Sequence, residues 1–345
     1  MTKPDQDISR WRAETPGCAT RIHLNNAGAA LMPAPVLQAV QDYLQMEGAI
    51  GGYEASDACA ADLAGFYTAV ARLLHTQPRN VAFCTSATDA YARALSAIPW
   101  RSDDVILTTD NDYVSNQIAF LALKKRFGIK LLRAKESPAG GADLDDMAYL
   151  IRQHAPKLVA VTQVPTSSGL VQPVEAVGRL CREHGIWYLV DACQSAGQLQ
   201  LDVQRIGCDF LSATTRKFLR GPRGAGFLYV SDRVLEEGLE MLLPDMRSGH
   251  WEAADQYRPA EDAHRFEYWE NAPALVLGSK VAVEYALDIG LDRIESRVRH
   301  LAEKTRHLLA DLPGVQVLDR GADLCGIVTA FHPKWAEQPL LEFLR

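Results

Sequence analysis

One stretch decides the fold, Tyr188–Val230: YLVDACQSAGQLQLDVQRIGCDFLSATTRKFLRGPRGAGFLYV. It begins within the short apolar run Ile186–Val190, which predicts a strand, and that strand delivers one carboxylate, Asp191, at its end. Open α/β sheets place their ligand groups at the carboxyl ends of strands. Asp191 is therefore a candidate site residue rather than a surface acid.

A single lysine, Lys217, occupies a distinctive setting in the same stretch. It follows Thr214 and Arg216 and precedes the glycine-rich run Gly221–Gly226, whose glycines allow tight turns. A lysine with hydroxyls, a cation and a tight turn around it predicts an anchored ligand of matching charge. Considered singly, each residue could instead have a structural role: Asp191 could cap a helix, and Lys217 could be a solvated surface lysine.

Length and composition bound the class of protein. The 345 residues suffice for roughly two ordinary domains, or for one large α/β domain with a smaller companion. The net charge of −7 argues against nucleic acid or an anionic membrane as the main partner. No apolar run approaches the roughly 20 residues that span a bilayer, and the polar N-terminus shows no signal peptide. We expect a cytoplasmic protein.

Cysteine and histidine patterns point away from a metal. The seven cysteines are odd in number and form no C-x-x-C pair, so they predict neither a disulfide framework nor a thiolate zinc site. The nine histidines show no H-E-x-x-H spacing. We expect no metal, and most cysteines to be small core residues.

Small and hydroxylated residues follow the predicted strand Val81–Cys84 and precede a helical run at Ala90–Ala97. At a helix N-terminus such residues expose backbone amides, which together with the helix dipole form an anion site. The candidate phosphate contacts are Ser86, Ala87 and Thr88. An ordinary N-cap would use the same residue types.

The residues collected so far resemble the fold-type I pyridoxal-phosphate (PLP) enzymes, specifically the class V aminotransferase and cysteine desulfurase group. That group has a strand ending in Asp-x-x-Gln, then Ser/Thr-x-His-Lys and a Gly-Pro-x-Gly turn. Here the pattern reads Asp191, Gln194, Thr214 and Lys217, with G-P-R-G following. Arg216 stands where many relatives have His, and either side chain can donate to a phosphate. The resemblance extends from His23 to about Phe331, so it covers nearly the whole chain.

The resemblance implies a fold and a domain plan. We expect an α/β protein with a mainly parallel central sheet sandwiched by helices, and a smaller α/β domain built from the N-terminal arm and the C-terminal segment. The expected parts are an arm at 1–20, a large PLP-binding domain at 21–260 and a small domain at 261–345. Relatives continue beyond the predicted helix Leu340–Arg345, so we expect the small domain to be incomplete. A homodimer is also implied.

The resemblance also assigns roles. Lys217 would form the Schiff base with PLP and act as general base, and Asp191 would keep the pyridine nitrogen protonated. Further contacts to the cofactor are expected from Ser86, Ala87, Thr88, Tyr113, Thr166, Gln194, Thr214 and Arg216. Tyr113 would stack on the ring or pack at an edge, and Thr166 stands where relatives have an Asn that touches the 3-oxygen. Asn26 and Ala27 would line the substrate side of the pocket or form only a turn.

The expected function is that of a PLP-dependent enzyme acting on a small amino acid. The form R-F-E-x-W-E at Arg265–Glu270 is similar to the branch of hercynylcysteine sulfoxide lyases and isopenicillin-epimerase-like proteins. It favours a C–S lyase or desulfurase-like enzyme, with an aminotransferase or epimerase as the alternative. Cys325 lies too early to match the desulfurase nucleophile. The alternative of another class is a non-catalytic scaffold, against which the retention of Asp191 and Lys217 argues.

Overall fold

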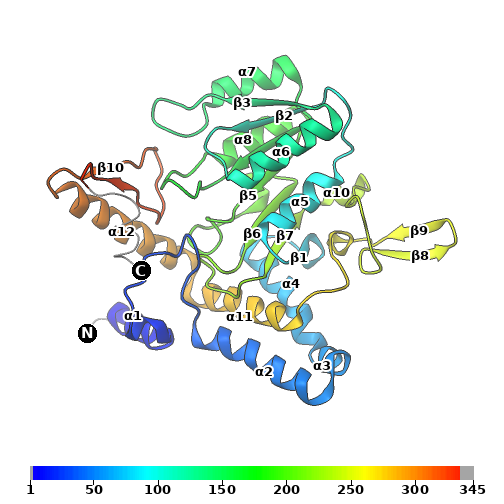
Figure 1. Ribbon diagram of the computed structural model, residues 1–345, viewed down its shortest axis with the longest axis horizontal. Coiled ribbons are helices and arrows are strands. Elements are labelled where there is room, and N and C mark those ends of the chain that lie inside the picture. Colours follow the sequence, from blue (N-terminus) through cyan, green and yellow to red (C-terminus); the bar gives the residue numbers. More distant parts are fainter. Residues whose placement is uncertain (1–2, 335–345) are drawn as a thin grey trace.

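A seven-stranded sheet forms the centre of the computed structural model, which describes residues 3–334 (Figure 1). The strands lie in the order β1-β7-β6-β5-β4-β2-β3, and β7 alone runs antiparallel to both of its neighbours. Their bounds are β1 Val81–Cys84, β2 Val105–Thr109, β3 Lys130–Ala134, β4 Leu158–Thr162, β5 Trp187–Asp191, β6 Phe210–Thr214 and β7 Gly226–Val230. The predicted mainly parallel α/β sheet is confirmed.

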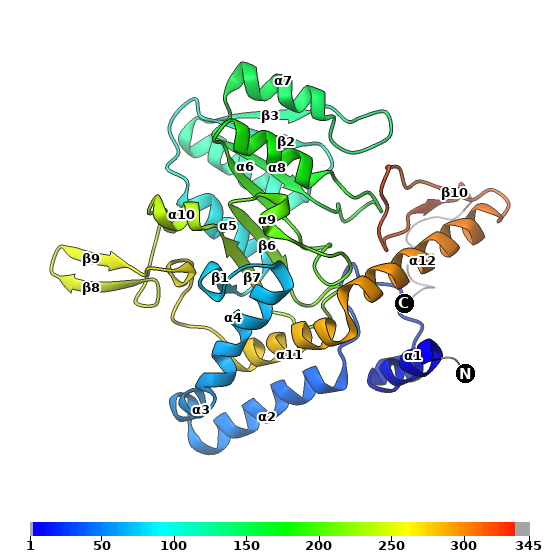
Figure 2. The same ribbon diagram turned by 180° about the vertical axis from the view of Figure 1, so that it is seen from behind.

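Helices cover both faces of this sheet because alternate side chains of each strand point to opposite sides. In β5, Tyr188 and Val190 join one buried cluster, whereas Trp187 and Leu189 join the other. The first cluster packs under α4 Ala60–Leu74, α7 Leu144–His154, α8 Val174–Glu183 and α9 Val203–Ile206. The second packs under α5 Ala87–Ala97, α6 Val114–Phe127 and α10 Asp232–Glu236 (Figures 1 and 2).

Three further helices lie beside the sheet near one end of the molecule. They are α2 Ala34–Ile50, α3 Gly52–Ala58 and α11 Pro273–Ile289, and α11 packs against both α2 and α4. The segment Ile50–Glu54 spans the junction of α2 and α3. Gly51 permits this junction, because its φ of 102° lies in the region that favours glycine.

The C-terminal part packs against the N-terminal arm. It consists of α12 Leu291–Ala310 and the short antiparallel pair β10 Gln316–Val317 and β11 Ala330–Phe331. Arg293 of α12 pairs with Asp7 of α1 Lys3–Ala13 at 2.7 Å. The domain boundaries at 20 and 260 stay predictions, and the predicted helix Leu340–Arg345 lies outside the described residues.

A short helix and a hairpin follow the last strand of the sheet. The helix α10 ends at Glu236, because the chain turns at Gly238 with a φ of 72°. The hairpin β8 Gly249–Ala253 and β9 Gln256–Pro259 was not predicted, and it projects away from the body of the molecule (Figures 1 and 2). Three short 3-10 helices complete the described elements, at Pro16–Ala19, Pro78–Asn80 and Ala263–Phe266. Within residues 3–334, no helix is both long and apolar enough to cross a membrane.

A glycine in α8, Gly178, allows α8 to approach α9 closely. Adding one methyl group at this position should therefore destabilise the fold. A Cβ at Gly178 would lie 1.8 Å from the carbonyl oxygen of Ile206, whereas a Cβ at Gly48 in α2 would meet nothing within 4 Å. Gly178→Ala should lower the free energy of unfolding by about 2 kcal/mol through overpacking. The matched Gly48→Ala should raise it by about 0.5 kcal/mol through helix propensity. Urea unfolding measures both, and equal effects of the two changes would contradict this packing.

Candidate active site

A cavity of about 300 Å³ lies at the sheet edge where β5 and β6 end and where the chain leaves β1 for α5. The size is at the lower end of the roughly 300–1,000 Å³ that small-molecule pockets occupy. It is lined by Thr85, Ser86, Ala87, Thr88, Tyr113, Asn116, Asp191, Cys193, Arg216, Lys217, Arg223 and Gly224. Seven predicted site residues therefore share one cavity, although they come from four separate parts of the chain.

Asp191 ends β5 and is 3% exposed. Its Oδ2 accepts a hydrogen bond from Asn116 Nδ2 at 3.0 Å, and its Oδ1 accepts one from the backbone amide of Cys193 at 2.9 Å. Burial raises the pKa of Asp191, the donors from Asn116 and Cys193 lower it, and the neighbouring carboxylate of Asp112 raises it again. The carboxylate is thus held by two donors from different elements.

Lys217 is 5% exposed and follows β6 in a tightly closed loop. The loop closes because the Thr215 hydroxyl donates to the carbonyl oxygen of Pro222 at 2.9 Å and the amide of Gly221 donates to the Thr215 carbonyl at 2.8 Å. The Lys217 ammonium lies 6.0 Å from the centroid of the Tyr113 ring. The amine and the aromatic ring therefore border the same space.

The N-terminus of α5 forms one wall of the cavity. Ser86 caps the helix, and its Oγ accepts a hydrogen bond from the amide of Asp89 at 3.1 Å. Asp89 in turn accepts from the amide of Thr85 at 2.9 Å and pairs with Arg93 at 2.6 Å, so the turn is fixed from both sides. The amides of Ala87 and Thr88 open the helix, where backbone donors have no partner within the helix.

Glycine brings β7 close to this wall. A Cβ at Gly226 would lie 2.9 Å from the carbonyl carbon of Ser86 and 2.5 Å from the carbonyl oxygen of Ala213. Only glycine fits there without a shift of the α5 turn or of β6. The first residue of β7 thereby holds the helix N-terminus beside the end of β6, within reach of Arg216 and Arg223.

Five predicted residues do not line the cavity, and one of them, Thr214, contacts a residue that does. Gln194 donates to the Thr166 hydroxyl at 3.2 Å and to the carbonyl oxygen of Ala27 at 3.1 Å, so these three form one group. Thr214 accepts a hydrogen bond from Arg216 at 3.0 Å. Asn26 is next to Ala27 in the chain and is absent from the described lining.

Four residues in or beside the cavity were missed in the sequence. Asn116 and Asp112 are a polar pair four residues apart, a spacing that places both on one side of a helix start but does not reveal their contact with Asp191. The cysteine pattern predicts mostly core residues, whereas Cys193 is half-buried and lines the cavity. Arg223 is the exposed cation of the G-P-R-G turn, and its presence in a turn motif was the available signal.

Arg220, close to Lys217 in the chain, is not among the residues that line the cavity. Its guanidinium donates to the carbonyl oxygen of Leu31 at 3.1 Å and to the Thr15 hydroxyl at 2.5 Å. It therefore ties the N-terminal arm to the Lys217 loop instead of facing the cavity. Cys325 is fully buried in an apolar cluster with Val164 and Leu199.

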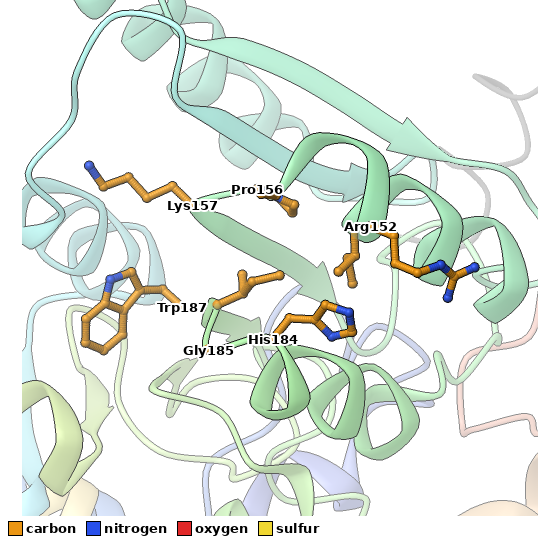
Figure 3. A pocket seen from close by; sticks show the side chains of 9 residues that line it. Arg152, Pro156, Lys157, His184, Gly185 and Trp187 are labelled. Atoms are coloured by element: carbon orange, nitrogen blue, oxygen red, sulfur yellow. The ribbon is translucent and has the colours of Figure 1, made fainter.

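A second hollow, of about 410 Å³, lies at the opposite edge of the sheet, where β4 and β5 begin. Figure 3 shows Arg152 and Lys157 on opposite sides of it, with their charged ends pointing away from each other. Lys157 is already paired with Asp104 at 2.7 Å. Because no set of polar groups converges there, the cavity at Lys217 is the candidate active site.

Comparison with known families gives one match over nearly the whole chain. The family model described as aminotransferase class-V matches residues 22–345. The chain is 30% identical over 325 residues to a probable hercynylcysteine sulfoxide lyase of Mycobacterium tuberculosis, which covers 94% of this chain and 78% of that protein. It is 27% identical over 335 residues to a probable cysteine desulfurase of Pyrococcus abyssi, with 93% and 82% covered.

Solved structures share the fold. The apo cysteine desulfurase of Thermococcus onnurineus superposes with a TM-score of 0.90 at 24% identity, covering 100% of this chain and 86% of that one. A cystine C–S lyase in complex with its product cysteine persulfide gives 0.85 at 23% identity, with 96% and 89% covered.

The Cys193 thiol provides a test of the cavity's geometry. Burial and the charge of Asp191 raise the pKa of Cys193 to about 11. Since the thiolate is the nucleophile, its alkylation by iodoacetamide should be slow at neutral pH and speed up roughly tenfold per pH unit until that value. Peptide mass spectrometry measures the rate, with exposed Cys18 of the same chain as the control for reagent access. A plateau near the ordinary value of about 8.5 would contradict this environment.

Proposed function

Because the chain belongs to the aminotransferase class-V family, we propose that Lys217 and Asp191 hold pyridoxal 5'-phosphate between them for cleavage of a C–S bond in a small amino acid. The family, the fold-type I architecture and the PLP dependence expected from the sequence are confirmed by the match over residues 22–345 and by the shared fold. The observation that carries the proposal is that a buried amine and a buried acid border one cavity.

The donor set fits this cofactor. A phosphate needs several N–H donors and positive charge, which the α5 amides, Arg216 and Arg223 supply on one wall. A pyridine nitrogen needs an acid, and Asp191 keeps lone pairs beyond the two donors it accepts. An aldehyde needs an amine, and Lys217 is the one lysine in the described lining.

Each residue has a separate task in this proposal. When bound, the cofactor supplies an electron-accepting ring that stabilises negative charge at the α carbon of an amino acid. Asp191 keeps the ring nitrogen protonated, and Tyr113 covers one face of the ring. Lys217 holds the cofactor before substrate arrives and then takes the α proton on Nζ. Gln194 with Thr166 and Ala27 forms the adjoining wall, where Asn26 would meet the substrate.

C–S cleavage is the reaction that the relatives favour. The chain resembles a sulfoxide lyase and cysteine desulfurases more extensively than it resembles an isopenicillin N epimerase, to which it is 28% identical over 76% of its length. Cys325 is fully buried, so it is not placed to receive sulfur. We therefore favour β-elimination without a persulfide on Cys325, and keep transamination or epimerisation as the alternative.

Reductive trapping tests the cofactor assignment. The protein loaded with PLP and treated with borohydride should carry the cofactor permanently on the peptide that contains Lys217. Lys217→Ala should lose this label, whereas Lys125→Ala, a change of an exposed lysine on α6, should keep it. Peptide mass spectrometry is the measurement. An unlabelled wild-type protein, or a label on another lysine, would overturn the assignment and favour the scaffold alternative.

The reaction class is separated by products. The loaded enzyme is incubated with cysteine, with a cysteine sulfoxide, and with alanine plus a keto acid. Pyruvate formed from the sulfur substrates without a keto acid supports the lyase. Amino-group exchange that depends on the keto acid would instead assign a transaminase. Racemisation of the amino acid, with neither pyruvate release nor exchange, would assign an epimerase.

We also propose a homodimer. Apolar side chains are exposed together along α2 and α3 and beside Trp269, among them Leu44 and Tyr53, and an exposed apolar patch of this kind marks an interaction surface. Tyr53, Trp269 and Asn271 line a separate cavity of about 670 Å³, away from Lys217.

A charge on this surface should separate the subunits. Light scattering after gel filtration should give twice the mass of one chain for the wild type and a single chain for Tyr53→Glu, because Tyr53 is 75% exposed in one subunit. Leu121→Glu on α6, where Leu121 is 53% exposed, is the control and should stay dimeric. A wild type with the mass of one chain would contradict the proposal.

The cysteines support a reducing compartment. All seven are free in the structure. Disulfides are rare where glutathione and thioredoxin keep thiols reduced, as in the cytoplasm, which is where we place this enzyme.

A further inference from the structure

One amide side chain in the cavity lining joins a buried acid, Asp191, to a half-buried one, Asp112. Asn116 Nδ2 lies 3.0 Å from Asp191 Oδ2 and 3.0 Å from Asp112 Oδ1, and Asn116 itself is 3% exposed. An asparagine amide nitrogen carries two hydrogens. One hydrogen can therefore go to each carboxylate, so that the amide separates two like charges and binds both.

We propose that Asn116 is a positioning residue that aims the Asp191 carboxylate at the ring nitrogen of the bound cofactor and keeps it ionised. The inference rests on the proposed function, because it concerns the acid that faces the cofactor. Asn116 acts through Asp191. It should therefore contribute to binding affinity only for a ligand whose ring carries a nitrogen that Asp191 can pair with.

The two oxygens of Asp191 are fixed by donors on different elements. Asn116 reaches Oδ2 from α6, and the amide of Cys193 reaches Oδ1 from the chain just beyond β5. Each oxygen keeps a lone pair. Two donors from separate elements leave the carboxylate little freedom to rotate, which fixes the direction of the remaining lone pairs.

The charges around Asp191 explain why an uncharged side chain with two N–H donors, Asn116, favours its ionised form. Asp112 faces it from the loop after β2 and opposes its ionisation, Lys217 favours ionisation, and the buried Tyr91 and Cys193 are neutral neighbours. Without Asn116, the buried Asp191 would lose the donor that lowers its pKa, whereas the half-buried Asp112 carboxylate would still raise it and so favour a protonated Asp191. A protonated Asp191 could not hold the proton of the ring nitrogen.

Asn116 is itself held by Asp112. Besides Asn116, Asp112 accepts hydrogen bonds from the amide of Tyr113 at 2.7 Å, from Gln117 Nε2 at 2.7 Å and from the Thr162 hydroxyl. One acid thereby fixes the start of α6, the backbone of Tyr113 and the amide that holds Asp191. Asp112 thus holds both Tyr113, which would stack on the cofactor ring, and the amide that orients Asp191.

The test compares PLP with an analogue in which a carbon replaces the pyridine nitrogen. Dissociation constants of both are measured for the wild type, for Asn116→Ala and for Asn111→Ala. Asn111 is the matched control, since it lies on the same loop but bonds to Glu136 at 2.8 Å. The wild type and Asn111→Ala should prefer PLP by roughly tenfold to a hundredfold, the range of a hydrogen bond to a charged group. Asn116→Ala should lose most of that preference.

The ratio of the two dissociation constants, for the analogue and for PLP, separates a positioning role of Asn116 from a packing role. A purely structural role would weaken both ligands alike and leave the preference unchanged, which would overturn the inference. A wild type that binds PLP but shows no preference would overturn it as well. A wild type that does not bind PLP would instead refute the proposed function. If Asn116→Ala does not fold, Asn116→Ser, which keeps one donor, should show an intermediate preference.

Discussion

The structure depends on a buried amine and a buried acid that do not pair with each other. Lys217 and Asp191 are nearly inaccessible, and the Lys217 side chain hydrogen-bonds to Cys193 rather than to Asp191. Burying an ionisable group without a partner is costly unless a ligand or a network compensates for it. Asp191 has such a network in Asn116 and the Cys193 amide. Both groups line one cavity, and in the proposed function a ligand with an aldehyde and a basic nitrogen would bind there.

The sheet topology is what brings these groups together. Strands β4, β5 and β6 are parallel, so Thr162, Asp191 and Thr214 end at the same edge. β7 lies between β1 and β6 and is antiparallel to both, so β1 runs in the same direction as β6. The end of β1, and with it the N-terminus of α5, therefore lies at that edge as well. A helix N-terminus, an acid and an amine therefore meet at one cavity, although they come from separate parts of the chain. Catalytic variety within this fold comes from the loops at this edge.

The sequence predicted the sheet and most of the cavity because those features are local. Asp191 ends an apolar run, Lys217 precedes a glycine-rich turn, and Ser86 precedes a helical run, so each carries its own signal. Asn116 and Asp112 carry none, because their importance lies in contacts with another strand. The hairpin at Gly249–Pro259 was missed for a different reason: its residues are mostly exposed, so no buried face imposes an alternating pattern.

The central claim is that Asp191 keeps the nitrogen of a ring bound at Lys217 protonated. The most direct measurement is the nitrogen NMR chemical shift of PLP labelled with ¹⁵N in the ring and bound to the wild type and to Asp191→Ala. The account predicts the shift of a protonated pyridine in the wild type and that of a neutral pyridine in the variant. A neutral shift in the wild type, or the same protonated shift in both, would contradict it.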